Sequence, residues 1–171
     1  MVKRPYTGNK DGEAKGLRPG MKVFIEETIK LSNGALWNNG DFGVRPMRGK
    51  EELSVHATGR AVDLSWRNMR DGKRGKPNGR YEAVRVMKIL EANADALGLE
   101  AIFDYFPKPW GRAWLCSRDA WSKYRTETIH GAPLGDWTHL EVSPEMADDP
   151  KSMAEAFRNL VIPTSYPATE G

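Results

Sequence analysis

The chain has 171 residues, and its 26 lysine and arginine residues against 23 acidic residues give a net charge of +3. Hydrophobic residues make up 39% and charged residues 29%, which is typical of a soluble globular domain, and the length suits a single hydrophobic core. The pI of about 9.0 favours acidic partners without identifying one. The single cysteine excludes an internal disulfide and a zinc site built from cysteines.

Residues 1–20 are rich in glycine and lysine, and we expect a flexible N-terminal segment there. No apolar stretch follows its basic residues, so we expect no secretory signal; no later run is long enough to span a membrane. The chain is therefore expected to stay in the cytoplasm in which it is made. Residues 21–162 are predicted to form one domain, and residues 163–171 a tail or the start of a linker.

The first half of the domain is predicted to contain a helix, two strands and a long loop. Residues 22–31 form an amphipathic helix that the following Ser-Asn-Gly ends, and residues 41–49 form a strand leading into a turn. Apolar and polar residues alternate over 59–66, which predicts a half-buried strand with Asp63 on its open face. Residues 67–80 contain six basic residues, three glycines and a proline, and predict an exposed loop.

The second half is predicted to contain two helices and three strands. Helical spacing over residues 81–97 predicts a helix that Gly98 ends, and Asp149 with Pro150 starts a last helix. The three strands are predicted at residues 100–106, 112–117 and 136–142. Together these elements predict an α+β domain with a small, mostly antiparallel sheet and helices packed against it.

Three residues of this chain make a set of ligands that suits zinc: His56, Asp63 and His139. Imidazole nitrogens and carboxylate oxygens bind zinc, and a catalytic zinc takes three protein ligands and leaves one position open. Gly59 allows a tight turn between the first two of these residues. The spacing alone leaves the metal site undecided, because a surface histidine is more often solvated than bound to a metal. Asp136, three residues before His139, is placed to act as general base and then as general acid.

Two motifs resemble those of a known family. "SVHATGRAVD" (residues 54–63) fits the S-x-H-x-x-G-x-A-x-D signature of the D-alanyl-D-alanine carboxypeptidase/VanY-like zinc peptidases, which include many phage endolysins. "DWTHLE" (residues 136–141) is similar to their second motif, an acid three residues before the last histidine ligand. The resemblance covers residues 45–142. It implies that His56, Asp63 and His139 bind Zn²⁺ and that Asp136 takes the catalytic position.

The resemblance also implies a function. Aspartate at position 136 is more similar to the endolysin branch, which cuts the L-alanyl–D-glutamate bond of peptidoglycan stem peptides. The carboxypeptidase branch usually has glutamate there. The resemblance implies a monomeric zinc peptidoglycan peptidase with a Hedgehog/DD-peptidase-like fold. Such an enzyme remains in the bacterial host cytoplasm until lysis and then degrades the cell wall. We expect neither a nucleic-acid partner nor membrane insertion.

Several neighbouring residues have two interpretations. Residues 43–49 are similar to an arginine-bearing strand and turn in endolysin relatives, and we favour Arg48, with Arg45 as the alternative, as the group that stabilises an oxyanion or holds a substrate carboxylate. Either arginine could equally pair with a surface carboxylate. Ser54 could donate a hydrogen bond to the substrate or fix its loop, and we favour the second role. Glu141 could orient an imidazole or be solvated.

Three other functions remain open. The same chemistry could act as a D-alanyl-D-alanine carboxypeptidase or on a D-alanine–diaminopimelate crosslink. A zinc-containing binding module of the Hedgehog type would hold the metal without hydrolysis. A basic nucleic-acid binder would rest on the pI and on residues 67–80 alone.

Overall fold

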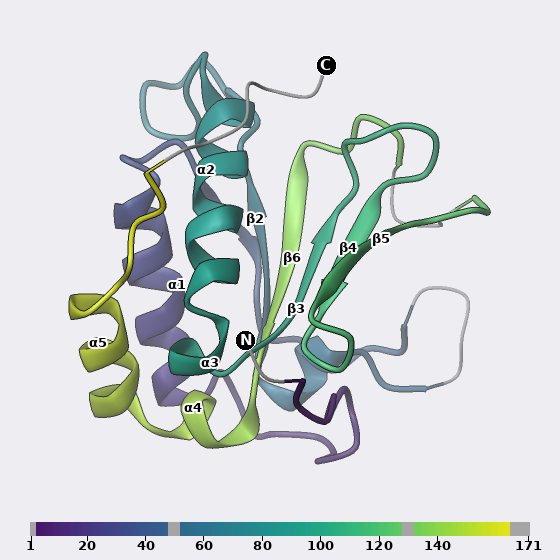
Figure 1. Cartoon of the computed structure of the whole chain (residues 1–171), viewed down its shortest axis with the longest axis vertical. Coiled ribbons are helices and arrows are strands. Elements are labelled where there is room, and N and C mark those ends of the chain that lie inside the picture. Colours follow the sequence, from purple (N-terminus) through teal and green to yellow (C-terminus); the bar gives the residue numbers. More distant parts are fainter. Residues whose placement is uncertain (1–2, 48–51, 128–131, 165–171) are drawn as a thin grey trace.

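The structure is a computed structural model that describes residues 3–47, 52–127 and 132–164. It confirms the α+β domain: an antiparallel six-stranded sheet, in the order β1-β2-β6-β3-β4-β5, with helices against one face (Figure 1). The strands are β1 (Trp37–Gly40), β2 (Ala61–Ser65), β3 (Leu99–Asp104), β4 (Arg112–Leu115), β5 (Ala120–Lys123) and β6 (Trp137–Val142).

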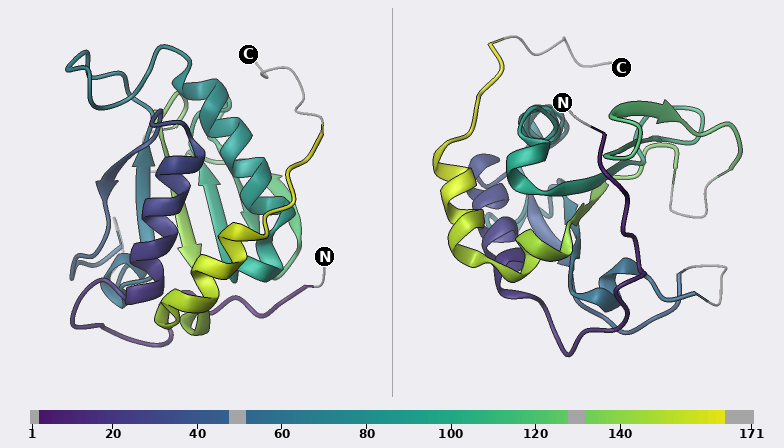
Figure 2. Two further views of the ribbon diagram at one scale, coloured as in Figure 1. Left: turned by 90° about the vertical axis from the view of Figure 1, so that its left-hand side faces the viewer. Right: turned by 60° about the horizontal axis from the view of Figure 1, so that its bottom comes forward.

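The helical layer lies on one side of the sheet, and both further views show it there (Figure 2). Its helices are α1 (Pro19–Leu31), α2 (Gly79–Ala92), α3 (Ala94–Leu97), α4 (Pro144–Asp148) and α5 (Pro150–Arg158). A short 3-10 helix, η1 (Val55–Thr58), precedes β2. Among the described residues, none of the helices combines the length and the apolar composition that crossing a membrane requires.

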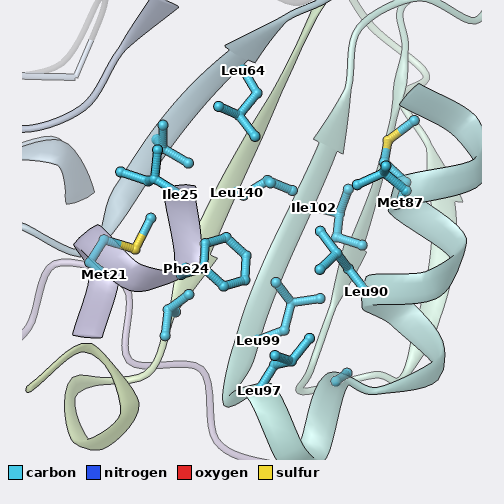
Figure 3. Packing of buried hydrophobic residues seen from close by; sticks show 14 of the residues in the cluster. Met21, Phe24, Ile25, Leu64, Met87, Leu90, Leu97, Leu99, Ile102 and Leu140 are labelled. Atoms are coloured by element: carbon cyan, nitrogen blue, oxygen red, sulfur yellow. The ribbon is translucent and has the colours of Figure 1, made fainter. Parts of the chain in front are cut away.

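The hydrophobic core fills the space between the helices and the sheet (Figure 3). Leu64 of β2, Leu140 of β6 and Ile102 of β3 are fully or almost fully buried there. They meet Phe24 of α1 and Leu90 of α2 (Figure 3). Because side chains alternate along a strand, the residues next to these point away from the helices. The opposite face of β2 and β6 is therefore available for a functional site.

The expectation of a flexible N-terminal segment is wrong for residues 3–18, which bind to the sheet and to η1. The side chain of Arg4 donates to the carbonyl of Leu99 at 2.6 Å, and the hydroxyl of Thr7 donates to Glu100 at 2.6 Å. Asp11 pairs with Arg60, whose side chain is fully buried. A segment that satisfies buried polar groups in this way is held in place despite its polar composition.

Several predicted elements also differ from the structure. Residues 41–47 form no strand, and β1 lies just before them; β5 and α4 were not predicted. The helix predicted over residues 81–97 is divided into α2 and α3 at Asn93. The amide of Asn93 donates to the carbonyls of Ile89 and Val161, so its side chain ties this junction to the chain after α5. The strands β2, β3, β4 and β6 and the helices α1 and α5 lie where the sequence predicts them.

Candidate metal centre

Asp63 and His139 meet because β2 and β6 are antiparallel neighbours. The two residues are direct partners in the register of this strand pair. Both side chains lie on the face of the sheet that the helices leave open, and Nδ1 of His139 is 2.9 Å from Oδ1 of Asp63. The alternation predicted from the sequence for each strand is thus confirmed, and the register aligns the two side chains.

His56 reaches the same place from η1. The hydroxyl of Ser54 caps this short helix by accepting a hydrogen bond from the amide of His56 at 3.3 Å, which supports its expected role in fixing the loop. Gly59 ends η1 with a φ of 72°, a left-handed conformation that suits glycine. The chain then enters β2, and Nε2 of His56 lies 3.4 Å from Oδ2 of Asp63.

One ligand atom from each of His56, Asp63 and His139 lies within 4.8 Å of the other two. Nδ1 of His56 is 2.6 Å from the carbonyl oxygen of Asp41, and Nε2 of His139 is 2.9 Å from Oε1 of Glu141. A carbonyl or carboxylate oxygen only accepts, so each of these two ring nitrogens carries the proton. The other nitrogen of each ring, Nε2 of His56 or Nδ1 of His139, faces the carboxylate of Asp63 and can bind a metal once it carries no proton. Histidines that bind a metal have this arrangement, and the three residues therefore fit a divalent cation such as zinc.

The electrostatics of the site favour a positive charge. Burial alone would lower the pKa of His139, but its hydrogen bonds to Asp63 and Glu141 outweigh burial and raise the pKa to about 10. Burial would raise the pKa of Asp63, but hydrogen bonds from His139 and His56 hold it well below its ordinary value. Without a metal, a proton on His139 neutralises part of the negative charge. A bound cation would take over that role.

A cleft of about 1220 Å³ opens over these three residues. Other parts of its wall come from β3, from the residues after β5 and from the N-terminal segment. The lining residues include Tyr6, Arg45, Phe103, Tyr105, Tyr124 and Trp137. Tyr105 and Trp137 lie against each other, with ring centroids 5.4 Å apart. A cleft of this size with aromatic walls and a few polar groups can hold a short peptide.

Asp136 lies outside the cluster of the three ligand residues. Both of its carboxylate oxygens accept hydrogen bonds from Arg67, at 2.6 and 2.8 Å. Its backbone carbonyl accepts from the amide of Trp66 and from the hydroxyl of Ser65, which fixes the start of β6 against the end of β2. Arg67 lines the cleft. The carboxylate of Asp136 is therefore held by Arg67 and is not among the described residues that line the cleft.

The structure describes the position of only one of the two candidate arginines. Arg45 lines the cleft, with its Nη2 4.0 Å from Oδ2 of Asp63 and its side chain 58% exposed. Arg48, the favoured candidate, lies outside the described residues.

Glu141 and Tyr6 make contacts at this site that the sequence did not establish. Glu141 contacts His139 and is 3% exposed, so its interpretation as a solvated strand residue is wrong. Its place two residues after His139 on the same strand face was the signal for this contact. The hydroxyl of Tyr6 donates to the other oxygen of Glu141 at 2.7 Å. No pattern in the sequence indicated Tyr6, because the pair is formed by chain segments that are far apart.

Comparisons of this chain with protein-family models, with curated proteins and with solved structures gave no match.

Proposed function

We propose that this chain is a zinc-dependent peptidase that hydrolyses an amide bond in the stem peptide of bacterial peptidoglycan. The observation that carries the proposal is the group of His56, Asp63 and His139 at the base of an open cleft, with both outer ring nitrogens hydrogen-bonded. The resemblance of residues 54–63 and 136–141 to the VanY-like peptidases supplies the substrate class. The aspartate at position 136 favours the L-alanyl–D-glutamate bond.

The proposed ligand atoms are Nε2 of His56, a carboxylate oxygen of Asp63 and Nδ1 of His139. Zinc, when bound, supplies Lewis acidity that polarises a carbonyl group and lowers the pKa of a water molecule to about 7. The carbonyl of Asp41 and the carboxylate of Glu141 keep the two imidazoles in their orientation.

Asp136 is the proposed general base and acid. It accepts the proton of the attacking water and returns a proton to the leaving amine. Glu141 is less suited to this role, because its two oxygens already accept hydrogen bonds from His139 and Tyr6 inside the protein. The partner of Asp136 is instead Arg67, whose side chain is half exposed and can change its position at little cost.

Arg45 is the one of the two candidate arginines that the structure describes, and it lines the cleft, where it can bind a negative charge. A guanidinium group can donate two hydrogen bonds to a carboxylate of the stem peptide or to an oxyanion that forms during hydrolysis. Its large exposure leaves these donors accessible to a ligand. Arg48 is the alternative for the same role. We propose further that the enzyme is held in the host cytoplasm until lysis.

Metal analysis combined with digestion of defined peptidoglycan tests the proposal. We expect one zinc per chain, and mass spectrometry of the released fragments should show a new amino group on D-glutamate. A new amino group on diaminopimelate or the release of terminal D-alanine would keep the zinc peptidase but change the bond. Zinc binding without hydrolysis would favour the Hedgehog-type binding module. His139→Ala is the control for the metal site, and we expect this variant to lose the zinc.

A further inference from the structure

A chain of hydrogen bonds joins the N-terminal segment (residues 3–18) to one of the proposed metal ligands. The hydroxyl of Tyr6 donates to Oε2 of Glu141 at 2.7 Å, and Nε2 of His139 donates to Oε1 of the same carboxylate at 2.9 Å. The side chain of Glu141 is almost completely buried. Each of its two oxygens therefore has a partner within the protein, one on the metal ligand and one on the N-terminal segment.

The ring of Tyr6 is fixed by its neighbours in the chain. The backbone amide of Arg4 donates to the carbonyl of Cys116 at 3.0 Å, and the backbone amide of Thr7 donates to Glu100 at 3.3 Å. Gly8 accepts a hydrogen bond from the buried side chain of Arg60, and its φ of 58° turns the chain back toward the ring. A Cβ atom at Gly8 would lie 3.1 Å from Cε1 of Tyr6. The hydroxyl of Tyr6 is thus presented to Glu141 by an anchored segment.

We propose that Tyr6 is a positioning residue of the metal centre and acts on His139 through Glu141. This inference rests on the metal site proposed above. A carboxylate with a single partner can rotate about its terminal bond, and the imidazole bound to it can rotate as well. The hydrogen bond from Tyr6 removes this freedom and keeps Nδ1 of His139 directed at Asp63. The N-terminal segment is therefore a part of the metal site.

The effect of losing such an outer contact is measurable in metal binding itself. Removing a partner that orients a histidine ligand typically weakens metal affinity by about 10- to 100-fold. Tyr6→Phe removes the hydroxyl and keeps the ring, so we expect its Kd for zinc to rise about tenfold. Thr7→Val is the matched control: it removes a neighbouring hydroxyl of the same segment, but that hydroxyl binds Glu100. We expect its zinc affinity to equal that of the wild type.

The experiment is a zinc titration of the full chain against a competing chelator, with the absorption spectrum of the cobalt-loaded protein as a second measurement. Tyr6→Phe should raise the Kd and change the cobalt spectrum, while Thr7→Val should do neither. Glu141→Gln should weaken zinc binding, and adding Tyr6→Phe to it should have little further effect, because both changes break one chain of contacts.

Three results would overturn the inference. Equal zinc affinity in Tyr6→Phe and wild type would show that the hydroxyl does not position the ligand. An equal loss in Thr7→Val would show that only the packing of the segment matters. Fully additive effects of Tyr6→Phe and Glu141→Gln would show that Tyr6 does not act through Glu141. Failure of the wild-type chain to bind zinc would instead overturn the metal site itself, so the two proposals fail in different ways.

Discussion

Asp63 and His139 face each other directly across β2 and β6, with Oδ1 and Nδ1 2.9 Å apart. Their meeting depends on the register of this strand pair as much as on the two residue types. A shift of β6 by one residue would turn His139 toward the helices, because successive side chains alternate between the faces of a sheet. Leu140 lies on the opposite face of β6 and prevents that shift, since the shift would expose it. The hydrophobic core therefore holds the proposed metal ligands in place.

His139 should make the stability of the metal-free protein depend on pH. Burial lowers its pKa, but the hydrogen bonds to Asp63 and Glu141 raise the pKa to about 10, against an ordinary value of 6.5. Since the folded-state pKa is the higher one, this contribution is complete below pH 6.5 and is lost as the pH rises through about 10. We expect the free energy of unfolding to fall over this window by an amount on the order of a few kcal/mol.

Urea unfolding of the metal-free protein across this pH window measures the effect. His139→Gln is the control, and its free energy of unfolding should change less with pH because the titrating group is absent. Zinc should reduce the pH dependence of the wild type by replacing the proton. Parallel pH profiles for wild type and His139→Gln would contradict the prediction.

Asp136→Asn should stop hydrolysis and leave zinc content unchanged. The amide keeps the size of the side chain but cannot take a proton from water, and a general base typically contributes about 10²- to 10⁴-fold to the rate. We expect kcat to fall by such a factor with KM little changed. Arg67→Gln is the control, because it breaks the ion pair with Asp136 but retains the carboxylate. Activity in Asp136→Asn equal to that of the wild type would exclude Asp136 as the base.

The sequence predicted the site best where the position of a side chain depends on a single strand or helix. Alternation in β2 and β6 predicted the faces that carry Asp63 and His139, and the caps Ser54 and Gly59 mark η1, which carries His56. The strands β1 and β5 escaped prediction because they are four residues long and largely exposed, so no apolar alternation marks them.

The N-terminal segment shows what sequence reasoning could not reach. Its polar composition predicted flexibility, but its polar groups are partners of charges that other elements bury. Arg60 at the start of β2 and Glu100 in β3 bind Asp11 and Thr7 respectively. Composition describes the average of a segment, whereas this contact depends on groups about 50 to 90 residues away. The contact of Tyr6 with Glu141 was hidden for the same reason.

Arg60→Met should strongly destabilise the protein. The guanidinium of Arg60 is fully buried and pairs with Asp11 at 2.9 Å and with Glu100 at 3.2 Å. Methionine would fill the space but would leave Glu100 as a buried charge without its positively charged partner, and such a change costs about 3–5 kcal/mol. The double variant Arg60→Met/Glu100→Gln should recover part of this loss. Denaturant unfolding gives both values, and a loss no larger than that of the surface variant Lys30→Met would refute the prediction.

Gly59→Ala should damage both the fold and the metal site, and Gly72→Ala is its matched control. Both glycines have a positive φ, 72° at Gly59 and 73° at Gly72, so alanine costs about 1–2 kcal/mol at either position. At Gly72 no atom lies within 4 Å of the added Cβ, whereas at Gly59 the carbonyl oxygen of Gly16 would be 2.4 Å away. A backbone atom of the N-terminal segment must then move. We therefore expect Gly59→Ala to lose more stability than Gly72→Ala in denaturant unfolding. We also expect it to bind zinc more weakly than Gly72→Ala, because Gly59 connects His56 to the strand that carries Asp63. Equal losses of stability in the two variants would mean that the left-handed backbone alone explains the glycine at position 59.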